Sequence, residues 1–264
     1  MHLLFAWLTI FSPMQAWDVP LAAFAWDGEK ETRLFLGGAT ETTPFALASI
    51  TKVFTATELA LQVLKGNIQL QEIAAENKTF FQLATHTSGL PREKGGALQP
   101  GYLYSNYGFD VLGEAIGRKV GLPFETLISE DILQPLQMEA TTFQRPRLGG
   151  SGGLFSTLKD MQHFLKANLA LEGPPFLQQA MRKARIPLLI VRPPFKMGLG
   201  WQIYEEIVDK NGAIQGYSSY IGMIPEYRIG LIILARKNKL PLTRIGREIL
   251  RRMKDAKISH AQRG

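Results

Sequence analysis

Short apolar runs bounded by turn residues predict several β-strands. Residues 21–26 and 32–36 flank the turn-prone Asp27-Gly28 near the start of the chain, an arrangement typical of a β-hairpin. Three more apolar runs in the C-terminal third predict successive strands: 199–204, 217–224 and 229–235.

Apolar residues spaced three and four positions apart predict helices between and after these strands. One helix covers 53–65 and ends at Gly66, and another is opened by Pro123. A third is expected to be capped by Ser156, and a last one spans about 242 to 254.

Strands near both chain ends with helices between them predict an α+β fold. We expect one antiparallel sheet, built from both ends and flanked by helices, and a second, central all-helical lobe. The sheet lobe would take about 17–48 and 195–255, and the helical lobe about 66–170, within a single domain over 17–264. A cleft between two lobes is a natural ligand site.

The first sixteen residues predict an export signal. An apolar run over 3–11 is followed by Ser12-Pro13 and by Ala16, a small residue suited to cleavage, although no Lys or Arg precedes the run. The run is too short to span a bilayer, so we expect a signal peptide over 1–16, a periplasmic or secreted protein and no stable membrane insertion. An uncleaved anchor and a buried first helix remain alternatives.

Composition excludes several kinds of chemistry. The chain has 264 residues, 45% apolar and 20% charged, which suits a globular protein. The absence of cysteine excludes disulfides, thiolate nucleophiles and cysteine metal sites. Four histidines without H-x-x-x-H or H-E-x-x-H spacing argue against a metal site. We therefore expect no metal and no cofactor. We also expect the protein to be a monomer.

The net charge of +7 is partly concentrated near the C-terminus. The favoured interpretation is a solvated helix face, because apolar residues form an opposite stripe. Attraction to anionic lipid or cell-wall polymer is an alternative. Nucleic-acid binding is not expected, because no aromatic residues interleave with the charges. The basic residues are Arg244, Arg247, Arg251, Arg252, Lys254 and Lys257.

Three short motifs carry candidate chemistry. The first, Ser49-Ile50-Thr51-Lys52, places a hydroxyl and an amine three residues apart, on one face if a helix begins at Ser49. A serine hydroxyl becomes a good nucleophile only when a base takes its proton, and a lysine of lowered pKa can help to do so. At a helix start, the Ser49 amide would also be free to bind an oxyanion.

The second and third motifs supply a phenol, an amide and a further cation. Tyr104-Ser105-Asn106 offers a phenol whose pKa would fall between two lysines, and an amide able to fix Lys52 and a substrate carbonyl. Lys210-Asn211-Gly212 offers charge for a substrate carboxylate and close backbone approach. The following Ala213 amide is a candidate second oxyanion donor.

Each motif also has a purely structural explanation. Ser49 would serve as a helix cap, Lys52 as a solvated lysine, Tyr104 as a half-buried aromatic, and Lys210-Asn211-Gly212 as a turn. Three such accidents in this order are improbable together. His86 is interpreted as a structural loop residue rather than a catalytic base, because no matching acid is evident.

With these motifs the chain resembles serine β-lactamases and penicillin-binding proteins, nearest to class C β-lactamases. The resemblance covers about 20 to 250 and implies a two-lobed α/β fold. Within this range the resemblance includes, besides the three motifs, the following segments: 45–52, 82–91, 151–157, 198–201 and 212–220.

The resemblance implies an acyl-enzyme at Ser49, a Lys52/Tyr104 base system assisted by Asn106, and oxyanion donors at the Ser49 and Ala213 amides. It places Lys210, Gly212 and Arg244 at the substrate. Two departures stand out: Asn211 replaces the usual hydroxyl residue, and the chain is shorter than class C enzymes.

The implied activity is β-lactam hydrolysis, with a β-lactam or a peptidoglycan peptide as the partner. A D-Ala-D-Ala carboxypeptidase, an esterase on the same scaffold and a non-enzymatic sensor of β-lactam or peptidoglycan remain alternatives.

Overall fold

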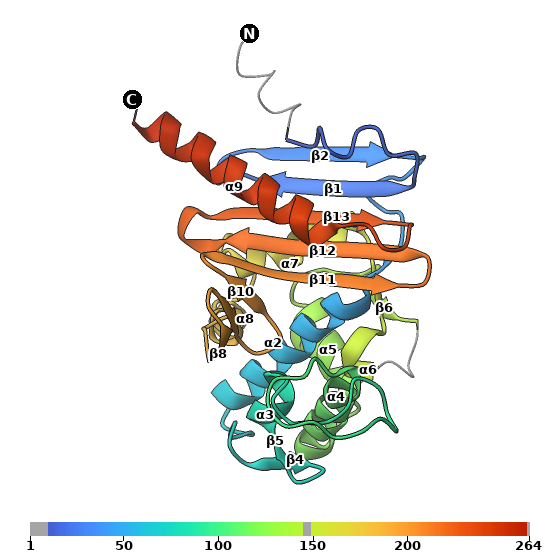
Figure 1. Ribbon diagram of the computed structural model, residues 1–264, viewed down its shortest axis with the longest axis vertical. Coiled ribbons are helices and arrows are strands. Elements are labelled where there is room, and N and C mark those ends of the chain that lie inside the picture. Colours follow the sequence, from blue (N-terminus) through green and yellow to red (C-terminus); the bar gives the residue numbers. More distant parts are fainter. Residues whose placement is uncertain (1–9, 145–148, 263–264) are drawn as a thin grey trace.

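The computed structural model describes residues 10–144 and 149–262, and over these residues the chain ends meet in one eight-stranded antiparallel sheet (Figure 1). The strand order is β2-β1-β13-β12-β11-β10-β9-β8. In chain order the strands are β1 (Leu21–Trp26), β2 (Glu31–Leu36), β8 (Leu189–Arg192), β9 (Phe195–Met197), β10 (Gln202–Tyr204), β11 (Ile207–Ile214), β12 (Tyr217–Ile224) and β13 (Ile229–Ala235). This confirms the predicted α+β fold.

Helices cover both faces of the sheet and form the lobe below it in Figure 1. They are α2 (Thr51–Leu64), α3 (Phe80–Ala84), α4 (Asn106–Val120), α5 (Phe124–Ile128), α6 (Gly149–Gly152), α7 (Leu158–Asn168), α8 (Pro175–Ala184) and α9 (Leu242–Ala261). Short strands complete the fold: β3 (Phe45–Ala46), β4 (Ile73–Ala75), β5 (Lys78–Thr79), β6 (Thr142–Phe143) and β7 (Leu154–Ser156). None of the helices in the described part of the chain has the combined length and apolarity that crossing a bilayer requires.

Apolar side chains along β13 point alternately into two separate hydrophobic cores, one on each face of the sheet. Leu231 and Ile233 pack with Ile249 and Leu250 of α9, whereas Ile232 and Leu234 belong to the larger cluster that contains α2 and α7. Successive side chains of a strand point to opposite faces, so one apolar strand serves both cores. The sheet thereby holds α9 on one side and the central helix α2 on the other.

The basic face of α9 is largely neutralised by acidic groups of the same chain. Arg247 binds the buried Asp209 through two contacts, of 2.6 and 3.0 Å, and Arg251 lies 3.0 Å from Glu205. Lys254 pairs with Glu206. These contacts favour the interpretation of this stretch as a solvated helix face, because little of its charge is left for a polymeric partner.

Replacing Arg247 by alanine should destabilise the fold. Asp209 is 0% exposed and also accepts a hydrogen bond from Tyr220, so the loss of Arg247 would leave a buried carboxylate without its cation. Breaking a buried pair in this way costs about 3 to 5 kcal/mol. Chemical denaturation should show that loss, whereas Arg252→Ala, which removes an exposed i,i+4 pair with Glu248, should cost less than about 0.5 kcal/mol. Equal effects of the two substitutions would contradict this account.

Several predicted boundaries were wrong. The helix cap is Thr157, which accepts a hydrogen bond from Asp160 N, while Ser156 ends β7. The strand expected over 199–204 is limited to Gln202–Tyr204, because Gly200 (φ 67°) turns the backbone just before it.

The N-terminal segment is only partly described, since residues 1–9 of the predicted signal peptide lie outside the described residues. Phe11 and Met14 are buried in the cluster between the sheet and α9. The segment from 10 onward therefore contributes to the core of the folded chain.

Candidate active site

Ser49 lies in a tight turn at the start of the central helix. It occupies a 3-10 turn, Ala48–Ile50, that leads directly into α2, whose N-terminal cap residue is Ile50. The expectation that a helix begins at Ser49 is thus corrected by two residues. Ala48 has a φ of 47°, a left-handed conformation that is uncommon for a residue with a side chain. Such local strain is found where a fold must hold a functional group in place.

Lys52 is fully buried and reaches back to Ser49. Its Nζ lies 3.3 Å from Ser49 Oγ, 2.8 Å from Asn106 Oδ1 and 2.7 Å from the Ser151 carbonyl oxygen. Burial lowers the pKa of Lys52 to about 8; the neighbouring Tyr104 opposes that shift, and Lys210 adds to it. The amine is therefore held firmly and loses its proton more easily than an exposed lysine does.

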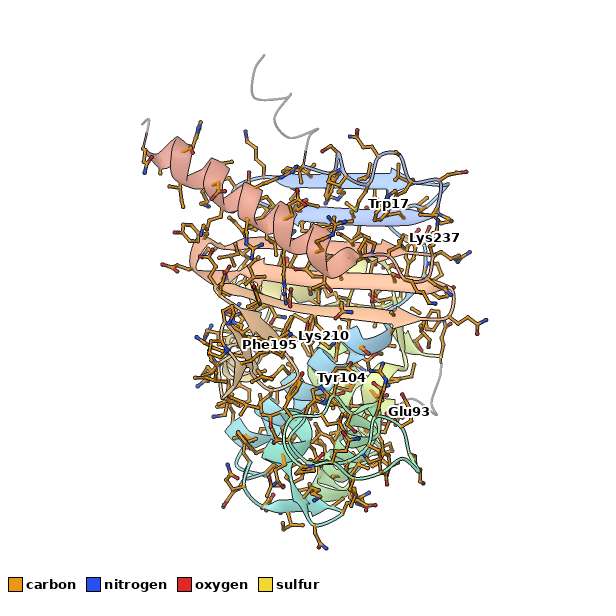
Figure 2. The ribbon with its side chains drawn as sticks, in the orientation of Figure 1. Trp17, Glu93, Tyr104, Phe195, Lys210 and Lys237 are labelled. Atoms are coloured by element: carbon orange, nitrogen blue, oxygen red, sulfur yellow. The ribbon has the colours of Figure 1, made fainter. Side chains whose placement is uncertain are left out.

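The Tyr104 ring lies between two ammonium groups. Lys52 Nζ and Lys210 Nζ are each 5.1 Å from the ring centroid, and Figure 2 shows Tyr104 next to Lys210 where the sheet meets the helical lobe. Burial alone would raise the pKa of Tyr104. The charges of Lys210 and Lys52, together with hydrogen bonds to Ser49 and Lys52, outweigh it and bring that pKa to about 7. A phenolate is thus accessible near neutral pH.

The backbone around Tyr104 is fixed by the start of α4. Ser105 caps this helix by accepting from Gly108 N (2.7 Å), and its hydroxyl donates to the Pro91 carbonyl (2.6 Å). The buried His86 accepts from Ser105 N at 3.1 Å, and burial together with the charges of Lys52 and Lys210 keeps its pKa well below the usual value. His86 is therefore a neutral structural residue, which confirms its predicted role.

Strand β11 brings the third motif against the Ser49 turn. Lys210 lies inside the strand, not in a turn, and its Nζ donates to the Asn211 carbonyl at 3.0 Å. A Cβ at Gly212 would collide with the Leu47 carbonyl and come within 3.1 Å of Ser49 N. Only glycine allows this close approach. Ala213, the next residue, is exposed at this edge.

Two residues of the third region lie away from this cluster. Asn211 pairs with Tyr220, whose ring packs against α9, so the Asn211 side chain belongs to the α9 face of the sheet. Arg244 is exposed in the first turn of α9, on that same side. The fold thus gathers Ser49, Lys52, Tyr104, Asn106, Lys210 and Gly212, but it does not bring Arg244 into contact with them.

Comparison with known proteins agrees with this geometry. The model of the Beta-lactamase family matches residues 16–253. The chain belongs to the Beta-lactamase family.

Relatives of this family member include two kinds of named enzyme. It is 27% identical to D-alanyl-D-alanine-carboxypeptidase/endopeptidase AmpH of Escherichia coli (strain K12), over 75% of this chain and 71% of that protein. It is 23% identical to a Beta-lactamase of Pseudomonas fluorescens, over 75% of this chain and 81% of that protein. A class C β-lactamase solved in complex with cefoxitin superimposes with a TM-score of 0.82 at 18% identity, covering 97% of this chain and 99% of that one. The chain is therefore a serine hydrolase of the Beta-lactamase family with the class C fold.

Other polar groups in this family member contact the motifs without belonging to them. Ser151 contributes its carbonyl to Lys52, and its N–H donates to Asp110 Oδ1 at 3.0 Å. Glu93 Oε1 accepts from Asn106 Nδ2 at 2.6 Å. The segment that contains Ser151 was noted from the resemblance, whereas Asp110 and Glu93 had no sequence signal beyond their nearness to the second motif.

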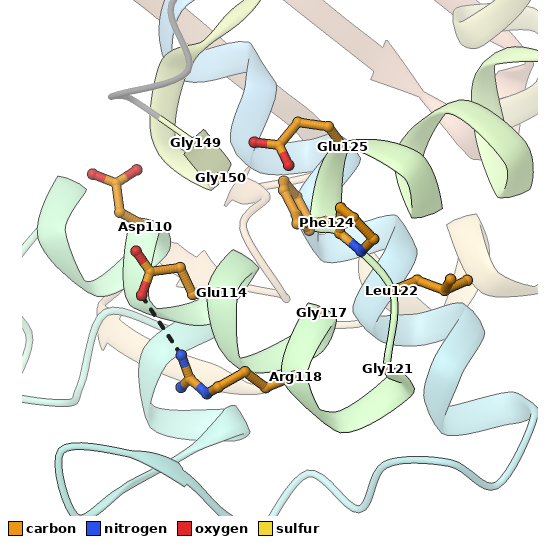
Figure 3. A pocket seen from close by; sticks show the side chains of 11 residues that line it. Asp110, Glu114, Gly117, Arg118, Gly121, Leu122, Phe124, Glu125, Gly149 and Gly150 are labelled. Carbon is orange, nitrogen blue, oxygen red and sulfur yellow. Dashed lines mark ion pairs between the residues drawn. The ribbon is translucent and has the colours of Figure 1, made fainter.

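A separate pocket of about 590 Å³ lies on the outer side of α4 (Figure 3). It is lined by residues that include Asp110, Glu114, Arg118 and Glu125, and the Glu114–Arg118 ion pair lies at its edge. None of the three motifs lines it. Asp110 is the residue that links this pocket to the Ser151 backbone and through it to Lys52.

Proposed function

We propose that this protein hydrolyses β-lactams through an acyl-enzyme formed at Ser49. The observation that carries the proposal is the position of Tyr104, whose ring centroid lies 5.1 Å from both Lys52 Nζ and Lys210 Nζ and whose phenol is hydrogen-bonded to Ser49, an arrangement that lowers its pKa to about 7. The Tyr104 phenolate takes the Ser49 proton while Oγ attacks the lactam carbonyl carbon. The carbonyl–nitrogen bond then breaks, and the proton passes from Tyr104 to the leaving nitrogen.

Deacylation uses the same groups in reverse. Tyr104 takes a proton from water, the resulting hydroxide attacks the ester carbonyl, and the proton returns to Ser49 Oγ. The developing oxyanion is bound by the Ser49 and Ala213 amides, which the close contact at Gly212 supports. Lys52 keeps Tyr104 ionised, Asn106 fixes Lys52, and Lys210 attracts the substrate carboxylate. Arg244 stays a predicted carboxylate ligand that would need the substrate to extend toward α9.

A second candidate is cleavage of peptides that end in D-Ala-D-Ala. It is favoured by the relative named as a carboxypeptidase and endopeptidase. Both reactions open an amide whose acyl group transfers to Ser49, so the same machinery serves either.

Intact-mass measurement with benzylpenicillin over time separates these functions. A β-lactamase should show a transient adduct, on a peptide containing Ser49, that disappears as product accumulates. A long-lived adduct would favour the D-Ala-D-Ala peptidase, which multiple turnovers of acyl-D-Ala-D-Ala would then establish. A long-lived adduct with no turnover of peptide or short p-nitrophenyl ester would identify a sensor, and complete absence of an adduct would overturn the proposal.

We also propose that the protein acts after export, in the periplasm or outside the cell. The apolar run over 3–11 supports this, and so does the extracytoplasmic position of peptidoglycan. N-terminal sequencing of the protein from cell fractions tests it. Cleavage after Ala16 would remove the buried Phe11 and Met14, so we expect such a product to be less stable than the longer chain. Recovery of the protein only from the cytoplasm would contradict export.

A further inference from the structure

Glu93 stands beside the reacting groups without a role in the proposed chemistry. Its Oε1 accepts a 2.6 Å hydrogen bond from Asn106 Nδ2, while Asn106 Oδ1 accepts from Lys52 Nζ at 2.8 Å. Because Lys52 Nζ also contacts Ser49 Oγ, Glu93 is the third group in a chain of contacts that begins at the reacting oxygen. Figure 2 places Glu93 on the helical-lobe side of Tyr104.

The backbone that carries Glu93 is rigidly held. The Arg92 carbonyl accepts from Asn106 N and Tyr107 N at 2.9 and 3.1 Å, and the preceding Pro91 carbonyl accepts from Ser105. Glu93 is therefore fixed against the start of α4 rather than swinging on a free loop. Its position relative to Ser49 is set by the same helix that sets Asn106.

Glu93 contributes a negative charge beside three cationic side chains. Lys52 and Lys210 flank Tyr104, and the Arg92 guanidinium lies 5.5 Å from the centroid of the Tyr104 ring. Arg92 Nε is 3.9 Å from Glu93 Oε1, at the limit of an ion pair, and both side chains are 68% exposed. Among the described residues the structure records no partner for the second oxygen, Oε2, of this exposed side chain.

An acyl group on Ser49 is confined on two sides. Its carbonyl carbon is bonded to Ser49 Oγ, the buried Lys52 closes the floor, and β11 closes the opposite side at Gly212. Asn106 contacts both Lys52 and Glu93, so a short series of hydrogen bonds joins the Glu93 carboxylate to the Ser49 oxygen. An extended chain gains a little over 1 Å per bond, so a cationic group about five bonds from the reacting carbonyl lies about 6 Å from it, on the scale of this series of contacts.

We propose that Glu93 selects acyl groups that carry an ammonium near the reacting carbonyl, such as the free α-amine of the residue preceding the reacting D-amino acid. The preference rests on the proposed acylation of Ser49. It applies whether the scissile bond belongs to a β-lactam or to a peptide. Because Glu93 is exposed, the expected discrimination is modest, on the scale of surface ion pairs.

Three penicillins that differ in the substituent on one acyl carbon test this selection. Ampicillin, benzylpenicillin and carbenicillin share the same nucleus and phenyl group, and one acyl carbon carries an ammonium, a hydrogen or a carboxylate, respectively. We expect acylation rate constants to fall in that order, and Glu93→Gln, which keeps an oxygen acceptor for Asn106, to reduce the ampicillin-to-carbenicillin ratio about fivefold. Raising salt to about 1 M, where the Debye length is about 3 Å, should reduce the ratio in the wild type and have little effect on the variant.

Each ratio is taken within one protein, so a partly unfolded preparation does not alter it. Glu29→Gln, an exposed change in the turn between β1 and β2, is the matched control and should leave the ratio as in the wild type. A wild-type ratio near one, or a ratio unchanged by Glu93→Gln, would overturn the selection while leaving acylation of Ser49 intact. Absence of an adduct with all three penicillins would overturn the proposed function and this inference together.

Discussion

Replacing Ser49 by alanine is expected to abolish covalent labelling by benzylpenicillin. The substitution removes the only atom that the proposed mechanism acylates, and Lys52, Tyr104 and Lys210 then have no alcohol to activate. The fold should survive, because Ser49 does not cap α2 and its side chain is only half-buried. Intact-mass measurement should therefore show unmodified protein with an unfolding transition near that of the wild type.

Ser259→Ala is a matched control for this loss. Ser259 lies on the exposed last part of α9, where its hydroxyl donates to the Asp255 carbonyl of the preceding turn. This variant should be labelled at the wild-type rate. An adduct on Ser49→Ala with the same stoichiometry as the wild type would show that another residue is the nucleophile.

Replacing Tyr104 by phenylalanine is expected to slow both acylation and deacylation by about 100-fold or more, the usual scale for loss of a general base. Phenylalanine keeps the ring that packs 4.4 Å from His86 and between the two lysines, so the change is confined to the hydroxyl. Stopped-flow acylation and the decay of the adduct measure the two steps separately. Loss of only one step would mean that a different group serves the other.

The assignment of Tyr104 as the base also predicts how the rate of acylation changes with pH. The base must be deprotonated, so the wild-type rate should rise as pH increases through about 7, the pKa of Tyr104. Lys210→Gln removes the larger of the two cationic effects, which should raise the pKa of Tyr104 and move this rise to higher pH. In Tyr104→Phe the rise near pH 7 should vanish. A wild-type profile that is flat across neutral pH would contradict the base assignment.

Local sequence patterns were sufficient to predict the elements whose conformation depends mainly on their own residues. Asp27-Gly28 between two apolar runs specified the first hairpin, and the apolar spacing after Ser49 specified the central helix to within two residues. The order of three motifs was enough to indicate which side chains meet. Their meeting was predictable because a nucleophilic serine, a base and a carboxylate-binding cation serve one reaction, even though nothing local connects them.

The remaining features depend on contacts between distant segments. Lys210-Asn211-Gly212 has the composition of a turn, yet pairing with β12 extends it into a strand. Thr157 and Ser156 are equally good caps by sequence, and only the end of β7 decides between them. Arg244 was placed at the substrate by resemblance, but α9 lies on the sheet face away from Ser49.

Two polar residues beside the site, Glu93 and Asp110, were not identified from the sequence, because they also depend on contacts between distant segments. Glu93 contacts Asn106 and Asp110 contacts the Ser151 backbone, and an acidic side chain near the surface has no sequence pattern that distinguishes it from a solvated one. Their significance follows only once the fold has placed them beside a buried lysine.

The central claim is that Tyr104 is a phenolate near neutral pH because two ammonium groups flank it. Ultraviolet absorbance of tyrosinate measures this directly as a difference between the wild type and Tyr104→Phe across a pH titration. The account predicts one tyrosine that ionises near pH 7 in the wild type and is missing from the variant. Coincident titrations of the two proteins, with every tyrosine ionising at about pH 10 or above, would contradict it.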